Sequence, residues 1–249
     1  MVQQLQLLLV MLVLWVWSPL HAQATGVLSP DANPEMIACD YRTSVCLRDE
    51  FMAGGYTTGI VGELGWTIVN GTATGIVAES NRPGIVRRDT GSTINTAASM
   101  YPRGLSSVGT INPSQRFEET WHIKLGQAVG TFDFRAGLGN ATTGDPPADG
   151  VYFEVLAADT NLFCVTRAAS VSTGSRLDSG VAAGTGWVAL KIIRTASAVQ
   201  FFVNDALVCS STTNVPTAML QPYVMLKNTE AVAKTVDIDL FDFRGWAAR

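Results

Sequence analysis

Apolar and polar residues alternate in short segments from Leu47 onward, and glycine, proline, asparagine, aspartate, serine and threonine separate these segments. The clearest case is Phe117 to Leu125, where the odd-numbered positions are apolar except Glu119 and the even-numbered positions are polar. Because successive strand residues point to opposite faces of a sheet, this alternation predicts a strand with one face in the core. Segments around Phe134 and Phe153 repeat the pattern. The sequence therefore predicts an all-β protein.

The last third of the chain contains a predicted hairpin and two further strands. Residues 198–203 and 206–210 flank Asn204-Asp205, two residues that tolerate the positive φ of a type I′ turn. Residues 187–194 form a strand before this hairpin, and residues 235–243 form the last one. The last strand has an apolar face and an acidic face, formed by Val236, Ile238 and Leu240 and by Asp237 and Asp239. Many antiparallel strands without an internal repeat predict a sandwich of two packed sheets, as in a jelly roll.

The first 24 residues have a different composition from the rest. Leu7 to Trp17 are all apolar, a run too short to cross a bilayer as a helix. Ala22-Gln23-Ala24 follows and matches the small-x-small pattern of a signal-peptidase site. We expect a signal peptide (1–24), an N-terminal linker (25–46) and one β-sandwich domain (47–249), hence a secreted or virion-associated protein without membrane contact after cleavage. The alternatives are an uncleaved membrane anchor or a chance match to the signal-peptide pattern.

Charge and histidine content exclude several functions. The formal net charge is -4 and only 15% of residues are charged, which excludes a polybasic nucleic-acid binder. The chain has two histidines, His21 in the leader and His122. A histidine-rich metal site, or a mechanism that needs two imidazoles in the mature protein, is therefore excluded.

Four cysteines in an exported chain predict disulfides, and three pairings are open. Cys39 and Cys46 are close in sequence, so we favour a small loop closed by these two and a second bridge between Cys164 and Cys209. The second bridge requires Cα atoms within about 7 Å. The alternative is that Cys164 is a small buried apolar residue.

Several short motifs occur in an order that resembles the concanavalin A-like lectin/glucanase superfamily, in the form common among tailed-phage structural and tail-associated proteins. They are Phe51, GELGW (62–66), RPGIVRRDTGS (82–92), RAGLG (135–139), DGVYFE (149–154), the Trp187 strand, FFVNDALV (201–208), TTNVPT (212–217) and VDIDLFDF (236–243). The resemblance implies a two-sheet jelly roll with one concave face, in a superfamily whose branches mostly bind or cleave glycans. The leader and the segment around Cys39 depart from the phage form and favour an exported product.

Catalytic carboxylates of the glucanase branches stand on one strand face in a pattern like E-x-D-x-x-E, and this sequence has no such string. Glu118 and Glu119 are adjacent and so point to opposite faces. Asp237 and Asp239 share a face of the last predicted strand, where a solvated surface is the simpler interpretation. We therefore assign no catalytic residue.

A polar sheet face is the candidate ligand site. If the strands at 117–125, 131–137 and 151–156 are neighbours in one sheet, their polar faces gather carboxylates, cations, an imidazole and a phenol: Glu118, His122, Lys124, Asp133, Arg135, Tyr152 and Glu154. Such a set suits hydrogen bonding to a sugar, or a polysaccharide lyase with a tyrosine or histidine base. The alternative is an ion-paired solvent face.

Calcium is the cation that the oxygen-rich loop 139–150 suits, with Asp145 and Asp149 as ligands. The alternative is that both aspartates cap turns beside the prolines. Among the tryptophans, Trp121 and Trp187 are expected in the core. No other cofactor is expected.

These observations favour a secreted, non-enzymatic β-sandwich that binds glycans or cell-surface polymers. The alternative is a phage-type virion or surface-assembly structural protein, which serves for decoration or as a fibre or tail-associated unit and has itself and other virion proteins as partners. A polysaccharide hydrolase or lyase is the third interpretation.

Overall fold

The computed structural model describes residues 44–51, 60–70, 72–74, 79, 82, 84–102, 111–127, 130–140 and 146–246. Within these ranges the chain forms sixteen strands and no helix. The described residues therefore contain no helix that is long and apolar enough to cross a membrane. The predicted signal peptide (1–24) lies outside the described residues and stays a prediction.

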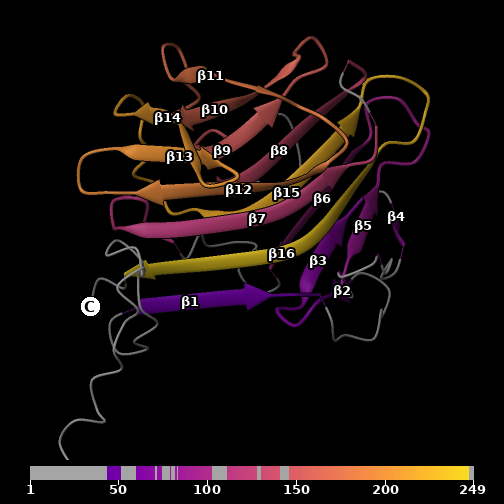
Figure 1. The fold of residues 1–249 in the computed structure, drawn as a ribbon, viewed down its shortest axis with the longest axis horizontal. Coiled ribbons are helices and arrows are strands. Elements are labelled where there is room, and N and C mark those ends of the chain that lie inside the picture. Colours follow the sequence, from indigo (N-terminus) through magenta and orange to yellow (C-terminus); the bar gives the residue numbers. More distant parts are fainter. Residues whose placement is uncertain are drawn as a thin grey trace, which may run out of the picture. The chain divides into compact units, whose positions relative to one another are not determined.

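The strands form two antiparallel sheets of eight strands each (Figure 1). Two packed antiparallel sheets are what the sequence predicts. Sheet A has the order β14-β13-β12-β7-β16-β5-β4, and β1 also pairs with β16. Sheet B has the order β11-β10-β9-β8-β15-β6-β3-β2. The strands of sheet A are β1 (Ser44–Asp49), β4 (Thr72–Thr74), β5 (Val86–Asp89), β7 (Phe117–Leu125), β12 (Trp187–Arg194), β13 (Val199–Val203), β14 (Ala206–Ser211) and β16 (Thr235–Trp246). Those of sheet B are β2 (Ile60–Val61), β3 (Trp66–Val69), β6 (Ala97–Pro102), β8 (Phe132–Gly139), β9 (Gly150–Val155), β10 (Asn161–Arg167), β11 (Arg176–Ala182) and β15 (Gln221–Asn228). The predicted all-β sandwich is confirmed.

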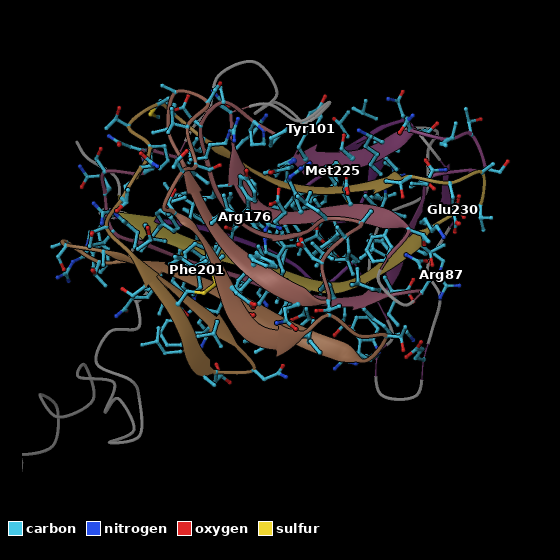
Figure 2. All side chains as sticks on the ribbon, turned by 90° about the horizontal axis from the view of Figure 1, so that it is seen from above. Arg87, Tyr101, Arg176, Phe201, Met225 and Glu230 are labelled. Carbon is cyan, nitrogen blue, oxygen red and sulfur yellow. A yellow bond between two sulfur atoms is a disulfide. The ribbon has the colours of Figure 1, made fainter. Side chains whose placement is uncertain are left out.

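The main core lies between the sheets and is built by the apolar faces of the alternating strands. At its centre the Trp121 ring lies 5.5 Å from Trp66 and 4.5 Å from Phe241, measured between ring centroids. A smaller cluster contains Tyr152, Val165, Tyr223 and Met225 and lies on the other face of sheet B. Figure 2 labels Phe201 of the main core and Met225 of the smaller cluster. Sheet B is thus buried on both faces at its centre.

The predicted hairpin is confirmed as β13 and β14, with φ of 49° at Asn204 and 64° at Asp205. Positive φ at both central residues matches the type I′ turn that the sequence indicates. Asn204 also accepts a hydrogen bond from the Ala189 amide at 2.9 Å through its side-chain oxygen, which joins the turn to β12.

The last strand differs from its predicted faces. A register shift between Ile238 and Leu240 leaves Asp239 without a partner on β7, so that Leu240 lies opposite His122 on the outer face. The predicted grouping of Leu240 with Val236 and Ile238 is wrong for this reason, since one extra residue reverses the alternation beyond it. Phe241 and Phe243 thereby enter the core.

The sandwich begins before Leu47, because Ser44, Val45 and Cys46 form the start of β1 and pair with β16. The predicted boundary of the linker at residue 46 is therefore too late. Cys164 of β10 and Cys209 of β14 form the predicted disulfide with a Cα–Cα distance of 6.4 Å, and it joins sheet B to sheet A. Cys39 lies outside the described residues, so its pairing with Cys46 stays a prediction.

Candidate functional site

The candidate polar face is divided between the two sheets. The sequence analysis placed the strands of Glu118, Arg135 and Glu154 side by side, but β7 lies in sheet A between β12 and β16, while β8 and β9 pair in sheet B. Glu118, His122 and Lys124 are therefore separated by the whole core from Asp133, Arg135, Tyr152 and Glu154. The prediction of one seven-residue face is wrong, and two half-sites remain.

The sheet B half is a buried ion-pair network. Arg135 donates from Nε to Glu154 Oε1 at 2.8 Å, and Arg176 donates from Nε to Glu154 Oε2 at 2.6 Å. Arg176 also pairs with Asp159. Arg135 and Glu154 are only 2% and 4% exposed, so their charges neutralise each other inside the protein. The charged groups of this network bind one another and are buried, so they are not available to bind a ligand.

The remaining two residues of this half have local structural roles. Tyr152 packs against Tyr223 at 6.1 Å between ring centroids, and burial raises the pKa of Tyr152 to about 12. Such a phenol does not act as a base near neutral pH. Asp133 accepts a hydrogen bond from the Ala157 amide at 3.0 Å and so holds the turn after β9.

Of the two predicted calcium ligands, only Asp149 lies in the described residues. Asp149 accepts a hydrogen bond from the side-chain amide of Asn140 at 3.0 Å and another from the backbone amide of Ala169 at 3.1 Å. These two bonds connect the two loops. Asp145 lies outside the described residues. No group of three or more histidine, cysteine, aspartate or glutamate side chains suited to a metal ion occurs in the part of the chain that the structure describes. The calcium site stays a prediction.

The sheet A half contains a hollow of about 210 Å³. We name it the Trp187 hollow, and it is lined by Arg82, His122, Trp187, Val188, Ala189 and Asn204. Trp187 begins β12 and lies on the outer face, opposite Lys124 of β7. The expectation that Trp187 is a core residue is wrong, because the register with β7 places it on the side away from the core. The buried position of Trp121 is confirmed.

Cation–π contacts and a hydrogen bond hold the Trp187 ring in place. The Arg82 guanidinium carbon lies 4.3 Å from the ring centroid and Lys124 Nζ lies 5.4 Å from it, distances typical of cation–π contacts. The indole N–H donates to Glu79 Oε2 at 2.9 Å, and Glu79 also pairs with Lys124. These hydrogen bonds from Lys124 and Trp187 hold the pKa of Glu79 below its ordinary value. Trp187 and Arg82 therefore form one wall of the hollow, and these contacts hold the ring in a defined orientation.

His122 is a neutral group in this hollow. Its Nδ1 lies 4.0 Å from Asp239, which in turn pairs with Arg82. Burial and the nearby charge of Arg82 lower the pKa of His122 from its usual 6.5. A neutral imidazole has one donor and one acceptor nitrogen, a combination that suits a hydroxyl group.

The acidic pair of the last strand is bound to arginines. Asp237 accepts from Arg87 at 2.6 and 2.7 Å, and Asp239 pairs with Arg82. The side chain of Asp237 is 1% exposed, so the expectation of a solvated acidic face is wrong at this position. These two carboxylates are neutralised and do not face each other as a catalytic pair.

The carboxyl groups with the largest upward pKa shifts lie in the interior. Burial raises the pKa of Glu119 to about 8, and burial together with a hydrogen bond to Glu63 raises the pKa of Asp49 to about 7. Both residues are at most 1% exposed. Burial also raises the pKa of Glu118 on the outer face of β7, where the charges of Lys191 and Arg244 oppose the shift. The two interior acids cannot reach a polymer substrate.

Sequence reasoning missed Glu79, Arg82 and Asn204 as parts of this site. Arg82 was considered only as part of the RPGIVRRDTGS motif of the family resemblance, and Asn204 only as a turn residue. Their meeting with Trp187 and His122 depends on strand order, for which the sequence contains no local signal.

Comparisons with known proteins identify the fold. The sequence matches no family model and no curated protein. A protein of unknown function from Shewanella oneidensis MR-1 is similar in structure, with a TM-score of 0.61, 13% identity and coverage of 87% of this chain and 98% of that one. The β-glucanase of Bacillus licheniformis has a TM-score of 0.52 and 16% identity, over 82% of this chain and 98% of that one. The carbohydrate recognition domain of Emp47p has a TM-score of 0.54 and 12% identity, over 84% and 100%.

The protein therefore has the concanavalin A-like jelly-roll fold shared by β-glucanases and lectin domains. At these identities the likeness establishes the fold alone. Function has to be argued from the chain's own residues.

Proposed function

We propose that the protein is a secreted, non-enzymatic β-sandwich that binds glycans or cell-surface polymers through the Trp187 hollow. The observation that supports this most directly is the grouping of a fixed indole ring, a neutral imidazole, an amide and a guanidinium around one open hollow. Sugar hydroxyls need donors and acceptors in this mixture, and ring C–H groups favour contact with an aromatic surface.

A hydrolase is less well supported by the same residues. Glycoside hydrolysis needs two carboxyl groups about 5 to 9.5 Å apart on either side of the scissile bond. In the described ranges, Glu154, Asp237 and Asp239 are each neutralised by an arginine. A lyase that uses Tyr152 as base is disfavoured by burial of that phenol. Binding requires none of these groups to be reactive.

A glycan array that spans neutral and acidic polysaccharides tests the proposal on the purified protein. We expect retention of a subset of glycans, and a loss of about tenfold in affinity in Trp187→Ala, because stacking of a sugar ring on the indole contributes about 1 kcal/mol and the variant also removes the ring that positions Arg82. Trp246→Ala is the matched control, since Trp246 is a partly exposed tryptophan outside the hollow. Silence across the array, or equal loss in the two variants, rejects the proposal.

If the wild-type protein cleaves a glycan that it retains on the array, the protein is an enzyme and not only a binding protein. Loss of polysaccharide viscosity, followed over time at the same protein concentration, distinguishes that outcome from binding.

A further inference from the structure

A second hollow, of about 270 Å³, lies away from the Trp187 hollow, between β1, the end of β16 and the segment before β7. We name it the Trp246 pocket. Its lining consists of Val45, Leu47, Ile111, Asn112, Gln115, Arg116, Phe117, Met219, Phe243, Gly245 and Trp246. The Trp246 amide donates to the Arg116 carbonyl oxygen at 3.0 Å, which holds two of its walls together.

Exposed apolar side chains gather at this pocket. Seven large apolar residues are exposed among those that the structure describes, and three of them line it: Val45 at 44%, Met219 at 43% and Trp246 at 40%. Single exposed apolar residues are ordinary, whereas a group around one concavity indicates a binding site.

The floor of the pocket is rigid. Phe117 and Phe243 stack at 5.9 Å between ring centroids with an interplanar angle of 27°, and both are buried. They belong to β7 and β16, which pair along most of their length. A preformed floor lowers the entropic cost of binding a small apolar group.

The rim is polar and positively charged. Asn112, Gln115 and Arg116 lie at one side of the pocket, and among the described residues no acidic side chain lines it. The Arg116 side chain is exposed and has no ion pair with any described residue. An arginine that forms no ion pair with the described residues, at the rim of a pocket with an apolar floor, is complementary to a molecule with an apolar body and an anionic end.

We propose that the Trp246 pocket binds a small carboxylate with an acyl or aryl body, whose apolar part contacts Trp246 and Phe243 and whose carboxylate pairs with Arg116. The volume is slightly below the roughly 300 to 1,000 Å³ of sites for drug-sized ligands, which restricts the body to a short chain or a single ring. This site is independent of the proposed glycan contact at Trp187.

Octanoate and its neutral analogue octanamide are the probes, titrated into the purified protein by calorimetry. We expect one octanoate per chain and an affinity up to about fivefold higher than for octanamide, because an ion pair at an exposed arginine contributes up to about 1 kcal/mol. Arg116→Gln should abolish this preference, and Trp246→Ala should weaken binding of both molecules.

Matched variants separate the pocket from general surface effects. Arg48→Gln changes an exposed arginine of β1 that pairs with Glu50, and Trp187→Ala changes a tryptophan outside the pocket. Both should bind octanoate as the wild type does. The proposal is overturned by the absence of saturable octanoate binding, by equal affinities for the two probes, or by unchanged octanoate binding in Trp246→Ala. Because glycan binding uses Trp187, either site can fail without the other.

Discussion

Trp121 donates its indole N–H to Glu119 Oε1 at 2.8 Å between the two sheets. The other carboxyl oxygen of Glu119 is buried and has no hydrogen-bond partner among the described residues. An ionised carboxylate at this position would lack solvation, which explains why burial raises the pKa of Glu119 to about 8. The protein therefore holds a neutral acid in its core at neutral pH.

This neutral acid predicts a loss of stability in alkali. In the unfolded chain Glu119 has its ordinary pKa of 4.5, so the folded state binds the extra proton between about pH 4.5 and pH 8. The stability that depends on this proton is complete below pH 4.5 and is lost as the pH rises through 8. Glu119→Gln keeps the acceptor for Trp121 and removes the titration. We expect the variant to exceed the wild type by on the order of 5 kcal/mol at pH 9, relative to their difference at pH 4, since each unit of the pKa shift corresponds to about 1.4 kcal/mol.

Urea denaturation at pH 4, 7 and 9 measures this effect. Asp49, whose raised pKa acts in the same direction, is present in both proteins and cancels in the comparison. If the free energies of unfolding of wild type and Glu119→Gln change in parallel with pH, the interpretation of Glu119 as a neutral acid is wrong.

The Glu154 network predicts a large effect of removing one charge. Glu154→Gln leaves the buried Arg135 without its carboxylate, and we expect a loss of about 3 kcal/mol in the free energy of unfolding. Asp205→Asn is the control, because Asp205 pairs with Lys191 at an exposed turn and asparagine accepts the positive φ there. The control should lose less than about 1 kcal/mol. Equal losses in the two variants would contradict a structural role for the network.

The disulfide between β10 and β14 predicts sensitivity to reduction. Its cysteines are 45 residues apart, and a crosslink of that span stabilises a protein by about 4 kcal/mol in the loop-entropy description. The double variant Cys164→Ala, Cys209→Ala should lose stability of this order. Addition of a reductant should lower the denaturation midpoint of the wild type by much more than that of the double variant, in which only the predicted bridge between Cys39 and Cys46 can still be reduced. A reductant effect of equal size in both proteins would assign it to another bond.

Local alternation was sufficient to predict much of the sandwich, including β7, β8, β9, β12 and the β13–β14 hairpin. In β7 the period of two is complete, so each side chain's face follows from its position in the strand. The turn at Asn204 was recognisable because its conformation restricts the residue type.

The site could not be predicted in the same way, because it depends on which strands are neighbours. β7 pairs with β12 and β16, both far away in sequence, so the alternation of β7 contains no information on its partners. The same limit applies to Leu240, whose face is reversed by a one-residue register shift that no residue pattern indicates. His122 was wrongly grouped with residues of sheet B, and Trp187 was wrongly expected in the core. Both errors arise because the sequence does not show which strands are neighbours.

The Trp187 hollow predicts that glycan affinity is constant from about neutral pH upward and falls in acid. His122 has a pKa below 6.5 because it is partly buried and lies near Arg82, so it is neutral at pH 7. Protonation removes its acceptor nitrogen and adds a second positive charge beside Arg82, which should weaken binding of a neutral glycan. The affinity for a glycan retained on the array, measured at pH 5, 6, 7 and 8, should be flat over the upper two values and lower at pH 5. His122→Gln has no charge to gain and should show the same affinity at pH 5 and pH 8. An acid loss of the same size in this variant would show that the dependence arises from another group.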